Sequence, residues 1–266
     1  MPALEVVTAR GTAIGATLAP LTLLTGDSRQ LRNGRGQILM LNSWVKSQVS
    51  GEYRIRSAAM HDDVDGIRGN HVLAEVYPQL PYGAAELLRA QDNLTFELSG
   101  SAVVGDMEFL SVLTYYEQID GIAANLISLT ELASRFKKKL GTTNTIATVA
   151  TGEYGGGEAI NVERSNFKPN TDYAILGANI SALCHLVGIR GSFSGNVRMG
   201  IPGNAANREV VQSWFIWLSQ AYGLPLIPVF NSAEVGSILV DAVQDENGAD
   251  VLVNLICAEL GPRMAA

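Results

Sequence analysis

The densest group of acidic side chains in the sequence is the segment HDDVDG at residues 61–66. Asp63 and Asp65 alternate ahead of a glycine, as carboxylates do in the first part of a calcium-binding loop. No acidic residue follows Gly66 at the spacing that the remaining ligands of such a loop require. The segment therefore favours a solvated turn. Metal binding by Asp63 and Asp65, and a contact with another subunit, stay open as alternatives.

Other segments contain residue types of catalytic or phosphate-binding sites without the full pattern. The Gly-rich stretch EYGGGEAI (153–160) lacks the Lys-Ser/Thr of a phosphate loop and lies between predicted strands, which favours a hairpin. Ser192 and Ser194 lie among glycines, but neither the Gly-x-Ser-x-Gly pattern nor a nearby acid–base partner is present. The 3 histidines are scattered. We therefore expect no catalytic residue, no cofactor and no enzymatic activity.

The composition describes a globular chain with a sizeable core. Of 266 residues, 47% are hydrophobic and only 17% are charged, and the net charge is −7. A negative balance argues against binding nucleic acid through its phosphates, so we expect no sequence-specific nucleic-acid binding. Cys184 and Cys257 lie in apolar runs and are expected to be buried free thiols in a reducing compartment. Neither a signal peptide nor a membrane span is recognisable, so we expect a soluble protein made in the cytoplasm.

Strand signals dominate both halves of the sequence. Runs rich in β-branched and aromatic residues, separated by Gly- and Pro-containing turns, predict about eight strands in each half. Two segments, 125–140 and 207–222, instead have apolar residues at helical spacing. The first is expected to end in the cations Lys137 to Lys139, and the second to be capped by Gly223.

A repeated phrase links the two halves. The segment GEYRIRSAAMHDDVDGIRGN (51–70) returns in altered form as CHLVGIRGSFSGNVRMGIPG (184–203), with Ile-Arg in both. Later strands can be matched in the same order, 90–100 with 229–243 and 109–119 with 251–260. Such a repeat predicts a duplicated unit.

Eight short strands with such turns, occurring twice, predict a mainly all-β chain of two tandem eight-stranded jelly-roll β-sandwiches with a few inserted or connecting helices. The expected domains are 1–141, which includes the connecting helix, and 142–266.

The helix predicted at 207–222 is apolar on more than one side, so it must be covered on more than one side. One side is expected to pack on its own sandwich, and the other on the sister domain or another subunit. Aromatic residues and prolines concentrate in the stretch 212–231, as at subunit contacts, although an ordinary core helix followed by a core strand is the open alternative. The candidate interface residues are Trp214, Phe215, Trp217 and Tyr222, together with Arg190 and Arg198 of the repeated phrase.

The matched halves and the helix between them resemble the double jelly-roll major capsid proteins of tailless icosahedral viruses. The resemblance is carried by the segments 53–69, 186–200 and 207–231 and covers nearly the whole chain, with no specific motif. It implies a viral structural protein found in the virion, a homotrimer whose six jelly rolls form a pseudo-hexagonal tile, and self-assembly into an icosahedral shell. Expected partners are other copies of the chain and capsid proteins such as a vertex protein. An internal membrane is neither indicated nor excluded.

Other classes of protein fit parts of the same pattern. A β-sandwich binding module, such as a carbohydrate reader or a phage tail or spike component, would have an aromatic platform or an acidic loop, and HDDVDG is the candidate. An enzyme on a two-barrel, cupin-like scaffold would need clustered histidines. A mixed α/β shell fold would need a long helix, against which the strand-rich pattern weighs.

Overall fold

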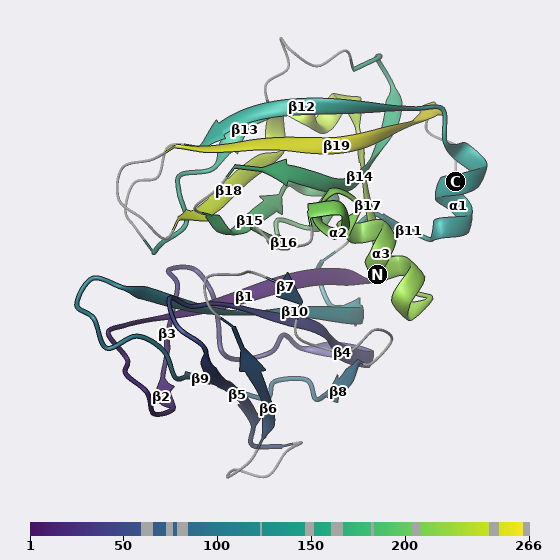
Figure 1. Ribbon diagram of the computed structural model, residues 1–266. Coiled ribbons are helices and arrows are strands. Elements are labelled where there is room, and N and C mark those ends of the chain that lie inside the picture. The colour runs from purple at the N-terminus through teal and green to yellow at the C-terminus, as the bar shows by residue number, and fades with distance from the viewer. Residues whose placement is uncertain are drawn as a thin grey trace.

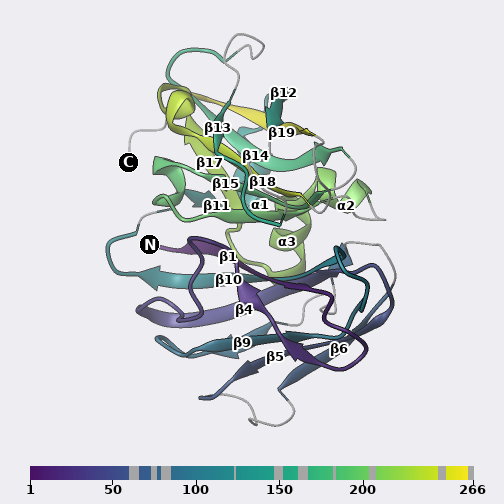
Figure 2. The same cartoon turned by 90° about the vertical axis from the view of Figure 1, so that its left-hand side faces the viewer.

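In the computed structural model of the protein, two β-sandwiches lie one above the other (Figure 1). Strands form both layers of each sandwich, and short helices lie at the junction between the sandwiches and at one end of the second (Figures 1 and 2). The structure describes residues 1–59, 66–72, 77–78, 85–122, 124–146, 152–160, 167–181, 184–203, 208–244 and 250–262.

The first sandwich consists of two antiparallel sheets that enclose a hydrophobic core. One sheet has the order β3-β1-β10-β4-β7, with β8 also paired to β4, and the other has the order β2-β9-β5-β6. Ile55, Phe96 and Val112 are fully buried in the core of this sandwich. The strands are β1 (Ala3–Thr12), β2 (Ala19–Pro20), β3 (Thr22–Leu23), β4 (Gly34–Lys46), β5 (Gly51–Ser57), β6 (Ile67–His71), β7 (Tyr77–Pro78), β8 (Glu86–Leu88), β9 (Leu94–Leu98) and β10 (Met107–Ile119).

The second sandwich has one sheet of order β11-β17-β14-β19-β12 and another of order β13-β18-β15-β16. The boundary expected between residues 141 and 142 falls inside β12. The strands are β11 (Leu126–Ile127), β12 (Lys138–Ile146), β13 (Glu158–Ala159), β14 (Thr171–Ile180), β15 (Cys184–Arg190), β16 (Met199–Pro202), β17 (Ile227–Asn231), β18 (Leu239–Gln244) and β19 (Val251–Pro262). The helices are α1 (Leu129–Arg135), α2 (Arg208–Gln212) and α3 (Trp214–Tyr222), with 3₁₀ turns at Ser192–Ser194 and Ser232–Ser237.

The two sandwiches share one strand order. The run β1-β10-β4-β7 has the same sequence of connections as β12-β19-β14-β17, and β2-β9-β5-β6 the same as β13-β18-β15-β16. This alternation between two four-stranded layers is the jelly-roll arrangement. The predicted mainly all-β fold of two tandem jelly-roll sandwiches is confirmed, and the matched segments of the repeat lie on equivalent strands, such as β5 with β15 and β10 with β19.

The sequence of β10 does not alternate between apolar and polar residues, because both faces of the strand are buried. Leu110 and Val112 lie in the core of the first sandwich, whereas Phe109 and Leu113 belong to the hydrophobic cluster that includes the second sandwich. Because successive side chains of a strand point to opposite faces, a strand covered on both faces carries a continuous apolar run. The outer face of the β1–β10–β4 layer is therefore covered by the second sandwich.

The helix predicted at 125–140 is much shorter than expected. The Ser128 side chain caps the start of α1, since its Oγ accepts a hydrogen bond from Glu131 N at 3.2 Å. The helix ends at Phe136, whose backbone is non-helical, and Lys138 already pairs with Glu259 as the first residue of β12. The expectation that the lysines form the last turn of a helix is thus wrong, because pairing with β19 extends the backbone there.

The helix predicted at 207–222 is interrupted at Ser213, and α2 and α3 together lie on β14. Their close approach depends on Gly177 of β14, where an added Cβ would lie 2.3 Å from the Val211 carbonyl oxygen. Gly223 caps α3 in the left-handed conformation at φ +67°, as predicted. Within the described residues, no helix is long and apolar enough to cross a membrane.

Candidate functional site

The junction between the two sandwiches contains a connected set of buried polar groups, and it is the candidate functional site. The outer face of β1, β10 and β4 meets β15, β16 and α3 there (Figure 1). Val6 N donates a hydrogen bond to Arg198 O at 2.9 Å, so β1 and the segment leading into β16 are joined through their backbones. Gly200 permits this approach, because a Cβ there would lie 2.7 Å from Val6 Cβ.

A chain of three polar side chains crosses the junction. Thr8 Oγ1 and Ser111 Oγ are 2.7 Å apart, and Ser111 Oγ lies 2.7 Å from His185 Nε2. The His185 ring stacks on Phe109 with a centroid distance of 4.9 Å. Burial, together with the charge of Lys46, lowers the pKa of His185 well below its usual value, so the imidazole is neutral and joins the sandwiches by hydrogen bonding.

The Ser111–His185 pair has the spacing of a nucleophile and its base, but not the rest of such a site. Both side chains are fully buried, so a substrate has no path to the hydroxyl. Within the described part of the chain, His185 Nδ1 has no hydrogen-bond partner, whereas in a catalytic triad an acid orients the histidine from that side. The arrangement serves packing between the sandwiches.

A charged network lies beside the hydrogen-bonded side chains of Thr8, Ser111 and His185, and it also crosses the junction. Arg198 bridges two buried carboxylates: its Nη1 lies 3.2 Å from Asp27 Oδ1, and its Nε lies 3.0 Å from Asp241 Oδ2. Arg190 Nε reaches the same Asp241 oxygen at 2.8 Å. The Arg198 guanidinium lies 3.5 Å from the centroid of the Tyr154 ring, close enough for a cation–π interaction.

Asp27 is held by groups from both sandwiches. One of its oxygens accepts hydrogen bonds from Thr8 N at 2.8 Å and from Tyr154 Oη at 2.9 Å. Burial raises the pKa of Asp27 to about 6, although these bonds and the charge of Arg198 act in the opposite direction. At the edge of the network, Glu153 accepts from Thr25 N at 2.9 Å and pairs with Arg10 at 2.9 Å.

The raised pKa of Asp27 predicts a pH-dependent contribution to stability. The folded protein holds a proton on Asp27 between about pH 4 and pH 6 that the unfolded chain releases. The contribution is therefore fully present below about pH 4 and lost as the pH rises through about 6. We expect the stability of the native protein relative to Asp27→Asn to fall by up to about 3 kcal/mol between pH 4 and pH 7, measured by urea unfolding.

Asp120→Asn provides the matched control for this measurement, since the Asp120 side chain is 51% exposed. The free energy of unfolding of Asp120→Asn relative to the native protein should change little over the same pH range. A difference between the native protein and Asp27→Asn that stays constant from pH 4 to pH 7 would contradict the prediction.

The aromatic interface candidates lie within the junction. Trp214 and Phe215 are completely buried, and Trp214 meets Trp44 of β4 edge-to-face at 6.0 Å between ring centroids. Trp217 and Tyr222 are partly buried: Trp217 stacks on Trp214 at 5.3 Å, and Tyr222 Oη donates to a β4 backbone carbonyl. These contacts join the two sandwiches of one chain, which is the sister-domain alternative that the sequence left open, and they leave Trp214 and Phe215 buried within the chain.

The other sequence candidates fall into two groups. Arg190 and Arg198 belong to the charged network inside the chain, and only the Arg190 side chain keeps substantial exposure, at 34%. Asp63 and Asp65 lie outside the described residues. Within the residues that the structure does describe, no group of three or more His, Cys, Asp or Glu side chains is placed to bind a metal ion.

Several residues of the junction had no signal in the sequence. Asp27, Tyr154 and Ser111 lie in segments of ordinary turn or strand composition, far in sequence from the groups they contact. The three glycines that follow Glu153 and Tyr154 indicated only a hairpin. An alignment of the two repeats could have pointed to Arg198, because Arg68 occupies the matching place in the first repeat.

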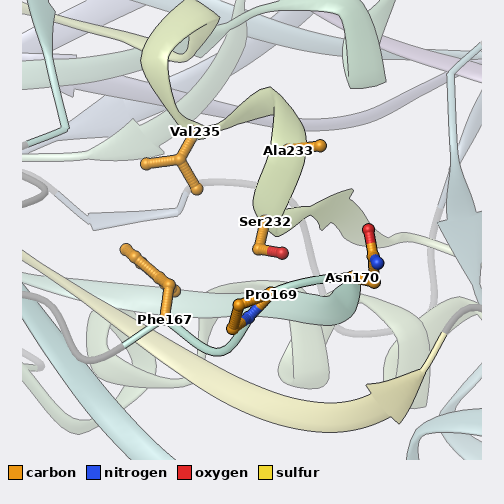
Figure 3. A pocket seen from close by; sticks show the side chains of 6 residues that line it. All are labelled: Phe167, Pro169, Asn170, Ser232, Ala233 and Val235. Carbon is orange, nitrogen blue, oxygen red and sulfur yellow. The ribbon is translucent and has the colours of Figure 1, made fainter.

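A cavity of about 330 Å³ lies at one end of the second sandwich (Figure 3). Figure 3 shows side chains from the segment before β14 facing side chains from the 3₁₀ turn after β17. Phe167 also packs edge-on against Tyr173 and Phe230 of the core. None of the described side chains that line the cavity is charged, so it suits a small uncharged group. Its lining residues are Phe167, Pro169, Asn170, Ser232, Ala233 and Val235.

Comparison with known proteins gives weak structural similarity. No family model and no curated protein sequence matches this chain. The crystal structure of the STIV MCP aligns over 98% of this chain and 97% of its own, with 7% identity and a TM-score of 0.24. The crystal structure of PBSX exported protein XepA aligns over 94% and 88%, with 9% identity and a TM-score of 0.21. Scores this low carry no functional argument, so the function has to be inferred from the geometry of the chain itself.

Proposed function

We propose that this protein is a viral structural protein, the major capsid subunit of an icosahedral virion. One observation carries the proposal: a single chain contains two jelly-roll sandwiches of the same strand order, joined by a buried junction. A subunit built from two equivalent units presents similar edges twice. Three such subunits present six similar edges, which suits a tile in a closed lattice.

The junction holds the two sandwiches in one fixed orientation. A tile keeps its outline only if its two sandwiches hold a fixed angle. Here a hydrogen-bonded chain from Thr8 to His185 and the ion pairs of Arg198 span the two units. Buried polar groups of this kind are costly to separate, because each would lose its partner. The described geometry therefore suits a subunit whose two halves move together.

The remaining parts of the proposal concern partners and location. The subunit forms a homotrimer, the trimers join into a shell with a vertex protein, and the protein is made in the host cytoplasm and resides in the virion. It has no enzymatic role and reads no nucleic-acid sequence. The net charge of −7 suits a shell that does not bind the genome through its phosphates.

The mass of the native protein in solution tests the proposal directly. We expect light scattering to give the mass of a trimer or of a larger assembly, and negative-stain images to show hexagonal outlines or closed shells. A monomer that persists up to high micromolar concentration would overturn the capsid function.

A β-sandwich binding module, such as a carbohydrate reader or a tail or spike component, is the second candidate. The uncharged cavity of Figure 3 favours it, because the Phe167 ring could face a sugar while Asn170 and Ser232 supply polar groups. A strictly monomeric protein that binds oligosaccharides would support this function over the first.

A further inference from the structure

One sheet face of the second sandwich is open to solvent although it lacks the charges of a solvated surface. In β12 and β19, directly paired residues share a face. Thr145 pairs with Leu252, and Thr143 pairs with Asn254. Asn254 in turn pairs with Asn179 of β14, so the row continues across three strands. We call this surface the open face, and its members are Gly141, Thr143, Thr145, Asn179, Leu252, Asn254 and Ile256.

The open face is at least partly accessible throughout. Leu252 is 47% exposed, and Thr145 and Asn179 are exposed as well. Side chains on the other side of the same strands, such as Val253 and Leu255, are fully buried in the core. The helices α2 and α3 pack on β14, and α1 contacts β19, whereas Thr145 and Leu252 of the β12–β19 pair remain exposed.

The equivalent face of the first sandwich is already an interface. Strands β12 and β19 correspond to β1 and β10 in strand order. The outer face of β1 and β10 carries Val6, Thr8, Phe109 and Ser111, and it is covered by β15 and β16 of the second sandwich. The chain thus covers this face in one of its two units and leaves it open in the other.

The composition of the open face also distinguishes it from a surface that faces water. Its seven members include no charged residue, and Lys139 lies only at one end. The outer face of β5, β6 and β9 in the first sandwich is instead charged, with Arg54 and Arg56 around Glu97 and with Arg68 nearby.

We propose that the open face binds a second copy of this chain, and that the copy supplies the β6 edge of its first sandwich. This proposal rests on the proposed capsid function and assigns its subunit interface. Within one chain, the β1–β10 face receives the β16 edge, and β6 is the equivalent edge strand of the first sandwich. β6 has no strand partner beyond β5 in the described sheet, so its outer edge is open to a contact.

The contact inside the chain is therefore repeated between chains. Because the two surfaces differ, the interface is heterologous and each copy uses both of its surfaces once. A heterologous interface generates a ring when the rotation closes.

The double variant Thr145→Arg/Leu252→Arg tests this interface. Both residues lie on the surface of the folded chain, so the variant should keep its β-rich circular dichroism and its melting temperature to within a few degrees. Two unpaired guanidinium groups in an interface should weaken self-association by at least about 100-fold, measured by sedimentation velocity across a concentration series. The control is Val104→Arg, which adds a charge at a side chain that is 92% exposed and outside the open face.

The outcomes separate this inference from the proposed function. If the native protein is monomeric, the capsid function itself fails. If the native protein assembles and the double variant assembles equally well, the open face is not the interface and the capsid function stands. Assembly by the native protein and by Val104→Arg, together with a folded but monomeric double variant, supports the proposal.

A second variant tests the partner surface. Asn70→Arg places a charge on the exposed position of β6 and should weaken assembly to a similar degree. Unchanged assembly of this variant would overturn the assignment of β6.

Discussion

Replacing Arg198 with methionine is expected to lower the free energy of unfolding by about 3–5 kcal/mol at pH 7. Arg198 is the cation that the structure places beside Asp27, whose side chain is only 4% exposed. Methionine conserves much of the side-chain volume, so the expected loss comes from the ion pairs with Asp27 and Asp241 together with the cation–π contact with Tyr154. Asp241 loses one of its two arginines but keeps Arg190. Urea unfolding at pH 7 measures the change.

The same variant should be less destabilised at pH 5. Because burial places the pKa of Asp27 near 6, the carboxyl group is mostly protonated at pH 5 and no longer needs a cation. Arg89→Met serves as the control, because Arg89 is exposed and its loss should cost less than about 0.5 kcal/mol at either pH. An equal loss for Arg198→Met at both pH values would show that its packing on Tyr154, not its charge, stabilises the junction.

The fold could be predicted because duplication left the same strand-and-turn phrase in both halves. Ile55-Arg56 lies one residue before the end of β5, Ile189-Arg190 ends β15, and the matched segments after them occupy equivalent strands in the two sheets. A jelly roll alternates its strands between two layers in a fixed order, so the order of the matched segments was informative. Hydrophobic periodicity alone would not have indicated the layers.

The same periodicity misled the prediction for residues 125–140. Leu129 and Leu132 do lie in α1, but Leu140 belongs to β12. A helical spacing of apolar residues also fits a short helix followed by a strand, as here. Because Lys138 and Lys139 pair with β19, long-range hydrogen bonds determine the backbone at a position where local preference gave the opposite prediction.

The candidate site could be predicted only in part. The sequence indicated that the helix at 207–222 needed cover on two sides, and the structure supplies it with β14 on one side and β4 on the other. It could not indicate that the second cover belongs to the same chain, because that depends on how the sandwiches dock. The charged network could not be predicted for the same reason, because Asp27 and Arg198 are 171 positions apart in the sequence.

Replacing Trp214 with alanine is expected to lower the free energy of unfolding by about 3–5 kcal/mol, because it empties a large, fully buried site. The indole also donates from Nε1 to Gly200 O at 2.9 Å, so the variant leaves a β16 carbonyl without its donor. Trp214 contacts both Trp44 of the first sandwich and Trp217 of its own helix. The loss should therefore weaken the coupling between the sandwiches as well as the core of one.

Weakened coupling has its own signature in a denaturant titration. The native protein should unfold in one transition, whereas Trp214→Ala should show either two transitions or a reduced slope of free energy against urea concentration. Trp217→Ala is the matched control, since Trp217 is only partly buried. This variant should lose less free energy of unfolding than Trp214→Ala and should keep a single transition. If Trp214→Ala lowers stability yet keeps one steep transition, the tryptophan supports the second sandwich alone. The angle between the sandwiches would then depend on Arg198 and on the chain from Thr8 to His185.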